Sequence, residues 1–278
     1  MKAIRIYLSA IVCFLVTASC QDSNREAKEY VQKIHELYNT GQYDAATQKI
    51  DSIQILYPKS FEQIKESLVL LNEVRKAQDT RQIAFCDSTL SVLNGKIDSV
   101  KQNFIFEKDK EYEENGRFIP KYFPAKSLSG TSLRSGVGED GYFYIESVYQ
   151  GGQYHNMVRV QTKDGTFAET LPVDDDGLNF RFNNLGKQYE IIKFSRSDEN
   201  GMGRFVYANA DKPLTVTLKG KNTYSYSLTN NSKRAISDSY QLSLLMLQAD
   251  SLRNVKEISL ARLEYLNRKQ QAESVPEQ

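Results

Sequence analysis

IAFCDSTLSVLNGKIDSVKQNF, residues 83–104, carries the clearest structural signal in the chain. Its apolar residues follow one another at alternating spacings of three and four: Ile83, Cys86, Leu90, Leu93, Ile97, Val100 and Phe104. On a helix this spacing forms one apolar stripe, which over three heptads is typical of a coiled-coil seam. Just before it, over residues 75–82, the stripe loses phase. There we expect either a break or a solvated stretch of a continuing helix.

The seam needs a partner, and the best one is a helix predicted over residues 232–270. Its first part holds too many apolar residues for one helix face, and a narrower stripe comes after it: Leu242, Leu244, Leu245, Met246 and Leu247, then Leu252, Val255, Leu263 and Leu266. An apolar helix of this length is not stable alone in water. We therefore predict an antiparallel helical, coiled-coil stalk. Whether the seam pairs within one chain or between two chains stays open.

The chain ahead of the seam is also helical in pattern, so that residues 25–106 form one predicted helical region. A first helix is expected over 25–39 and a second over 43–57. The residues Gly41–Ala46, followed by Pro58, resemble a single tetratricopeptide-like helical hairpin. Because repeat arrays need several stacked copies and one copy is visible here, a plain helical hairpin is the favoured alternative.

Residues 117–230 change to a period of two, which indicates strands. Strands are predicted over 142–149, 154–162, 166–171, 189–194, 204–208, 214–219 and 223–228, with a further alternation at Leu178, Phe180 and Phe182. Asp164-Gly165 is a strong hairpin signal, because this pair tolerates positive φ. Short strands at this spacing predict an antiparallel β-sandwich or barrel inserted between the helices. The predicted fold class is therefore α+β.

The amino terminus predicts export. Residues 1–19 begin with the positive charges of Lys2 and Arg5 and continue into an apolar run over 6–16. Small residues come directly after this run. The layout is that of a secretory signal peptide, and the run is too short for a comfortable membrane span.

The end of this segment, Thr17-Ala18-Ser19-Cys20, resembles the lipobox of bacterial lipoproteins. The resemblance implies that Cys20 becomes the new amino terminus and is acylated, for example with palmitate, and that residues 20–24 form a tether. It also implies an outer-membrane location, because Gln21 stands where an aspartate would retain the protein at the inner membrane. The leaflet stays open. An ordinary signal peptide that leaves Cys20 as a free thiol is the alternative.

Composition argues against several function classes. The 36 basic and 35 acidic residues balance, which argues against a nucleic-acid partner. Cys86 is the one cysteine after Cys20, and we read it as a buried apolar residue of the seam rather than a redox or intermolecular thiol. With His35 and His155 as the only histidines, a zinc site is not expected, and we predict neither a metal nor a cofactor.

No catalytic set stands out, and we predict a protein that is not an enzyme. The acidic run Asp174–Gly177 lacks the spacing of a calcium loop and is read as a solvated turn. His155 could act as a general base, with Ser147 nearby in sequence, but no nucleophile motif accompanies it. A hydrolase that uses the carboxylates of the β region stays open as an alternative; these are Glu139, Asp140, Glu146 and Glu169.

An aromatic turn gives the candidate ligand site. Aromatic faces beside amide side chains suit sugars or peptides, and tyrosine is also a common strand residue that packs on its neighbours. The candidate residues are Tyr142, Tyr144, Tyr149, Gln153 and Tyr154. We expect a membrane-anchored envelope lipoprotein that acts as a binding or structural module, with the membrane and a protein or glycan as partners. A glycan- or peptidoglycan-binding lipoprotein is the alternative.

Overall fold

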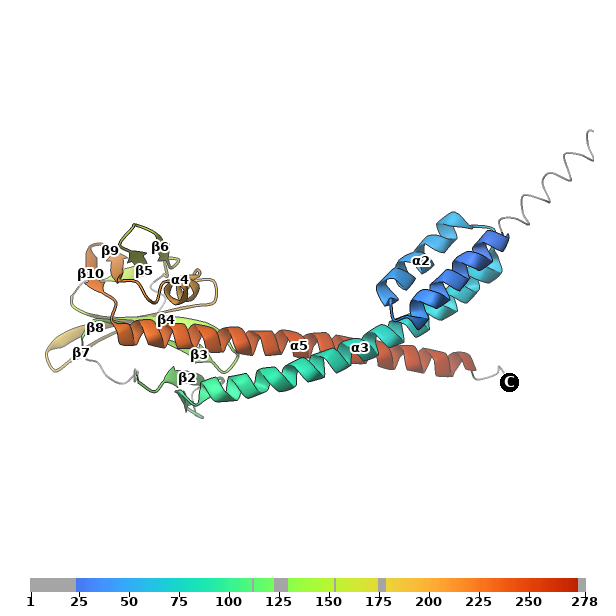
Figure 1. The fold of residues 1–278 in the computed structure, drawn as a ribbon. Coiled ribbons are helices and arrows are strands. Elements are labelled where there is room, and N and C mark those ends of the chain that lie inside the picture. Colours follow the sequence, from blue (N-terminus) through green and yellow to red (C-terminus); the bar gives the residue numbers. More distant parts are fainter. Residues whose placement is uncertain (1–23, 112, 123–129, 153, 175–178, 275–278) are drawn as a thin grey trace, which may run out of the picture. The chain divides into compact units, whose positions relative to one another are not determined.

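The computed structural model describes residues 24–274, except 112, 123–129, 153 and 175–178. The predicted signal peptide, Cys20 and most of the acidic run at 174–177 thus lie outside the described residues. The chain is α+β with antiparallel sheets, and it divides into two compact units (Figure 1). Unit 1 joins the chain up to Ser88 with the chain from Arg253 onward, and unit 2 is Thr89–Leu252.

Unit 1 is helical. It contains a helical segment over 24–39, α2 Tyr43–Leu56, and parts of the long helices α3 Phe61–Lys101 and α5 Asn230–Ser274. The chain reverses between the first two helices at Gly41, whose φ of 72° few other residues adopt readily. Apolar side chains of the first three helices form the core of this unit: Ile34, Ala46, Ile50, Leu70, Leu71 and Val74.

Helix α3 is continuous through residues 75–82, so the helix does not break there, but the stretch is not the solvated one expected, since Asp79 is buried in it. Two acidic residues of α3 pair with α5 within unit 1. Arg262 Nε lies 3.5 Å from Asp79 Oδ2, and Lys256 Nζ lies 2.5 Å from Asp87 Oδ1. Asp79 thus pairs with Arg262, whereas Asp87, further along α3, pairs with Lys256, which comes earlier in α5. The two helices therefore run antiparallel in this unit.

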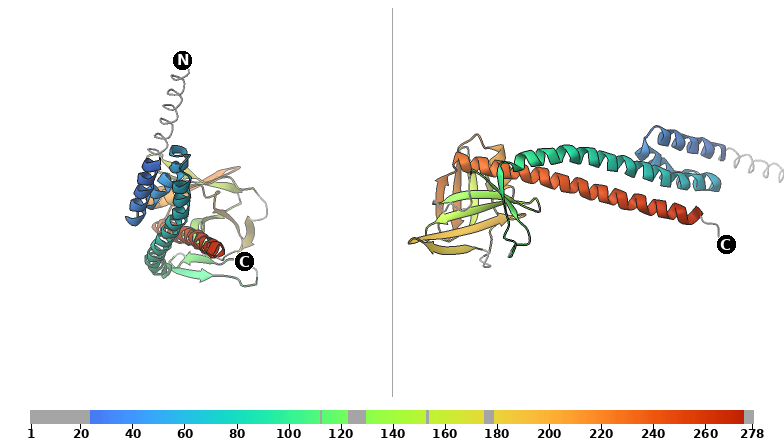
Figure 2. Two further views of the ribbon diagram at one scale, coloured as in Figure 1. Left: turned by 90° about the vertical axis from the view of Figure 1, so that its right-hand side faces the viewer. Right: turned by 90° about the horizontal axis from the view of Figure 1, so that it is seen from below.

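Unit 2 holds two antiparallel sheets. The strand order is β1-β2-β3-β4-β8-β7 in the six-stranded sheet and β10-β9-β5-β6 in the four-stranded sheet. The strands are β1 Phe104–Glu107, β2 Arg117–Pro120, β3 Ser132–Gly138, β4 Phe143–Gln150, β5 His155–Thr162, β6 Phe167–Glu169, β7 Phe180–Asn184, β8 Lys187–Ser195, β9 Leu214–Gly220 and β10 Thr223–Ser227. The first part of α5 lies beside the sheets of this unit (Figure 2).

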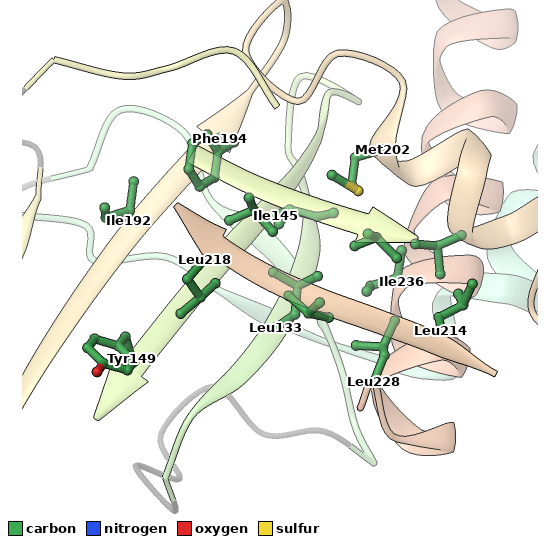
Figure 3. Close-up of a cluster of buried hydrophobic side chains, with 14 of the residues drawn as sticks. Leu133, Ile145, Tyr149, Ile192, Phe194, Met202, Leu214, Leu218, Leu228 and Ile236 are labelled. Atoms are coloured by element: carbon green, nitrogen blue, oxygen red, sulfur yellow. The ribbon is translucent and has the colours of Figure 1, made fainter. Parts of the chain in front are cut away.

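One apolar core joins both sheets, and Figure 3 shows it. The six-stranded sheet contributes Leu133, Ile145, Ile192 and Phe194, and the four-stranded sheet contributes Val158, Val160, Leu214, Val216 and Leu218. The short helix α4 Met202–Ala208 adds Met202 and Val206, and α5 adds Ile236. A second cluster packs α3 against α5 inside unit 2: Leu90, Leu93, Ile97, Leu242 and Ala249, with Phe104 and Val137.

Two local predictions were wrong. Residues 204–208, predicted as a strand, belong to the helix α4 Met202–Ala208. The period of two over this short stretch was misleading, because Met202 and Val206, one helical turn apart, are the residues that enter the core. The helix before the sheet ends at Lys101, so Phe104 starts β1 rather than closing the seam. Among the described residues, no helix combines the length and the apolar character needed to cross a membrane.

Candidate functional site

A buried polar group lies between the two sheets of unit 2. Ser147 belongs to β4, Glu190 to β8 and His155 to the start of β5, and their exposed fractions are 0%, 2% and 3%. Strands β4 and β8 pair with Tyr149 opposite Glu190 and Ser147 opposite Ile192. Glu190 therefore shares the inward face of β8 with Ile192 and Phe194, both core residues. A carboxylate at such a position needs partners.

His155 and Arg181 supply these partners. Nδ1 of His155 lies 2.5 Å from Glu190 Oε2, and the His155 backbone N–H donates to the same oxygen at 3.0 Å. Arg181 Nε, from the neighbouring strand β7, donates to Glu190 Oε1 at 2.8 Å. Both carboxylate oxygens are thus engaged. His155 connects the four-stranded sheet to the six-stranded sheet, because Glu190 and its two strand neighbours belong to the latter.

The electrostatics of Glu190 are set by these contacts. Burial raises the pKa of the carboxyl, but the hydrogen bonds from His155 and Arg181 outweigh it, so the net pKa lies below the ordinary value of 4.5. Glu190 is therefore ionised near neutral pH. The arginine balances its charge, and the site as a whole carries no large excess of either sign.

Ser147 completes a chain of three side chains. Its Oγ lies 2.9 Å from His155 Nε2, so serine, histidine and carboxylate stand in the order of a nucleophile, a base and an orienting acid. The serine is fully buried, however, and neither of the two hollows found at this end of the sheet is lined by Ser147 or His155. A ligand in the inner hollow would meet Glu190 and Arg181, so the arrangement serves to join the sheets and to hold those two residues.

The two hollows lie beside the turn between β4 and β5 and the hairpin between β7 and β8. The inner hollow has a volume of about 190 Å³ and is lined by Gly151, Gly152, Tyr154, Arg181, Phe182, Asn183, Gln188, Tyr189 and Glu190. The outer one, of about 520 Å³, is lined by Gln150, Gly151, Gly152, Asn183, Gly186, Lys187 and Gln188. The guanidinium carbon of Arg181 lies 4.2 Å from the centre of the Tyr154 ring, so these two residues form one wall.

The structure separates the predicted ligand-binding tyrosines. Tyr144 and Tyr149 lie on opposite faces of β4, and both are buried: Tyr149 packs edge-on to His155, and Lys193 lies over Tyr144. Tyr142 is exposed beneath the guanidinium of Arg196, away from the hollows. Tyr154 is exposed and lines the inner hollow. Gln153 lies outside the described residues.

The candidate catalytic carboxylates each have a nearby cation. Lys108 pairs with Glu139, Arg196 with Asp140, and both Arg159 and Lys219 with Glu169; the buried guanidinium of Arg134 attracts Glu146. For Glu139 the hydrogen bond from the backbone of Gly116, followed by Lys108, holds the pKa below its ordinary value. A general acid would need a raised pKa. No group of three metal-ligating side chains occurs in the described part of the chain.

Comparisons with protein-family models, with curated proteins and with solved structures found no match to this chain. The candidate site therefore has to be judged by its own geometry.

Unit 1 contains a larger cavity, of about 870 Å³, between the start of α2, α3 and α5. Asp79 and Arg262 lie in it, with the side chain of Asp79 almost fully buried. Because the arginine pairs with this carboxylate, the polar groups of this cavity connect α3 to α5. The hollows of unit 2 instead display amide groups and aromatic rings toward solvent, and they are the better candidate for a ligand site.

Sequence reasoning missed Glu190 and Arg181, the two charged residues of the inner hollow. Glu190 could have been recognised from its spacing: it stands two residues before Ile192 and four before Phe194, on the strand face where an apolar residue is expected. Arg181 could be recognised only through its pairing with Glu190 across β7 and β8.

Proposed function

We propose that this protein is an exported, lipid-anchored binding module of the bacterial cell envelope. The observation that carries the proposal is the amino-terminal segment, in which a short apolar run over 6–16 ends close to Cys20. Acylation of Cys20 would attach the protein to the outer membrane without a spanning helix, because each buried methylene of an acyl chain contributes about 0.8 kcal/mol. The β unit would then carry the ligand site.

The proposal extends to the architecture. The antiparallel contacts of α3 with α5 in unit 1, and the apolar cluster that these helices share in unit 2, support a helical stalk. The single core between two antiparallel sheets supports a β-sandwich inserted between the two helices. In this proposal the stalk belongs to one chain, since α5 covers the seam of α3.

A binding role fits the site better than catalysis. The buried serine lines neither of the two hollows described above, and the candidate carboxylates are matched by cations. The inner hollow exposes groups that recognise a ligand: a tyrosine ring, amides, and a charge pair held in place by His155.

The anchor is tested with globomycin, which blocks removal of lipoprotein signal peptides. In a bacterial host, treatment should make a lipid-modified precursor accumulate in the membrane fraction. The Cys20→Ser variant should not be acylated and should give no globomycin-dependent band. Processing that is the same with and without the antibiotic would refute the anchor.

A further inference from the structure

The two hollows of unit 2 form one extended site. They share four lining residues: Gly151, Gly152, Asn183 and Gln188. The inner volume of about 190 Å³ is below the roughly 300–1,000 Å³ typical of pockets for drug-sized ligands, so it admits one small unit. The outer volume of about 520 Å³ has room for the next units of the same ligand. This arrangement fits a chain of small units, of which the terminal one enters the inner hollow.

The lining has the chemistry of a site for hydroxyl groups. Gln150, Asn183 and Gln188 each carry an amide that can both donate and accept a hydrogen bond, which matches a hydroxyl group. The ring of Tyr154 offers apolar surface on which the C–H face of a sugar ring can lie. Tyr154 is 63% exposed and so is accessible to such a ring.

The charges of the inner hollow favour a neutral ligand. Arg181 donates to Glu190, and this carboxylate is also held by His155, so the two opposite charges at the bottom of the hollow compensate each other. An anionic ligand would meet the carboxylate of Glu190, and a cationic one would meet Arg181. Because His155 and Arg181 hold Glu190 in one place, the site is formed before the ligand arrives, which lowers the entropic cost of binding.

From these observations we infer that the extended site binds a neutral oligosaccharide, one terminal sugar of which enters the inner hollow. The inference rests on the proposed role of the protein as a binding module. A peptide is the competing ligand, and β7 is an edge strand with which it could pair, but an extended peptide also needs pockets for its side chains. The shared lining here consists instead of two glycines and two amides.

The test uses the mature chain from residue 20 onward, produced with Cys20→Ser so that it carries neither the signal segment nor an acyl group. A glycan array with neutral and acidic oligosaccharides identifies a binder, and calorimetry measures its affinity for chain lengths from one to six sugars. We expect binding to neutral glycans that strengthens beyond a single sugar. The double substitution Asn183→Ala with Gln188→Ala should weaken it at least tenfold.

Two further positions make the result specific. Asn222→Ala changes an exposed amide of the β9–β10 turn and should leave the affinity within twofold of the unsubstituted protein. Tyr154→Phe keeps the ring and should retain binding, whereas Tyr154→Ala should lose it. Equal melting temperatures of all variants would show that folding is intact.

Three outcomes would overturn the inference: no neutral glycan on the array binds, binding is unchanged by the double substitution, or acidic glycans or a peptide library bind in its place. If only peptides or acidic glycans bind, and the double substitution abolishes this, the ligand class is wrong while the binding role stands. Loss of the globomycin effect would reject the anchor and leave glycan binding untouched.

Discussion

The contact between His155 and Glu190 gives the sharpest prediction for the β unit. In Glu190→Leu, two buried donors of His155, the backbone N–H and Nδ1–H, lose their acceptor. Each unsatisfied buried donor costs about 1–3 kcal/mol, and removing one member of a buried charge pair costs about 3–5 kcal/mol. We expect Glu190→Leu to lower the free energy of unfolding by about 3–5 kcal/mol. His155→Leu should cost a similar amount, because the buried carboxylate then keeps only Arg181 and the backbone N–H of residue 155 as partners.

The double variant separates this pair from a simple loss of packing. With both side chains replaced, neither a buried charge nor an unpaired imidazole remains, so the cost should be smaller than the sum of the single costs by about 1–3 kcal/mol. The assay is urea unfolding followed by circular dichroism, with melting temperature as a second measure. At about 2–4 °C per kcal/mol, each single variant should melt about 6–20 °C lower.

A matched control is the exposed ion pair between Arg196 and Asp140. Asp140→Asn should cost less than about 1 kcal/mol, because a solvated pair contributes little. The buried pair would lose its assigned role if the two single variants were as stable as the control, or if their costs added to within about 0.5 kcal/mol in the double variant.

Individual side chains give three more predictions. Three hydrogen bonds outweigh burial and lower the pKa of Glu190 in the folded protein. The stabilisation that Glu190 provides is therefore complete above its ordinary pKa of 4.5 and is lost as the pH falls through the lower folded pKa. The melting temperature should drop below about pH 4.5, and it should drop less steeply in Glu190→Gln. A Cβ on Gly220 would lie 2.1 Å from the carbonyl oxygen of Tyr154, so Gly220→Ala should lower the free energy of unfolding in urea by about 1–3 kcal/mol. As a control, Gly95 lies in open space on α3, and Gly95→Ala should stabilise the protein by about 0.5–1 kcal/mol. Equal effects of the two substitutions would contradict this. The buried Tyr226 hydroxyl has no hydrogen-bond partner in the described chain, so Tyr226→Phe should be neutral or stabilising by up to about 1–2 kcal/mol, and a loss of more than about 1 kcal/mol would reveal a missing partner.

Local patterns predicted part of the β unit well, although they gave no individual strand for β1, β2 or β3. The alternation of Leu214, Val216 and Leu218 with polar residues predicted β9, and all three apolar side chains enter the core. The Asp164-Gly165 turn predicted the hairpin of β5 and β6. In both cases the information lies within a few neighbouring residues, where side-chain periodicity and backbone preference decide the structure.

The candidate site depends on pairing between distant strands, which local patterns do not contain. Ser147 and Glu190 lie on neighbouring strands because β4 pairs with β8, although three strands separate these two in the sequence. Both side chains contact His155, which comes from the other sheet. The prediction grouped Tyr144 with Tyr149 although an odd spacing within one strand places them on opposite faces. Residues 204–208 alternate like a strand, but they form the helix α4, because Met202 and Val206, one helical turn apart, are the side chains that pack into the core.

Acylation of an exported envelope protein underlies the proposed function, and mass spectrometry of the mature amino-terminal peptide tests it without intermediate steps. We expect the peptide to begin at Cys20 and to carry a thioether-linked diacylglyceryl group, with or without a further acyl chain on the new amino group. A mature protein that begins elsewhere, or that begins at Cys20 with a free thiol, would contradict the proposed anchor.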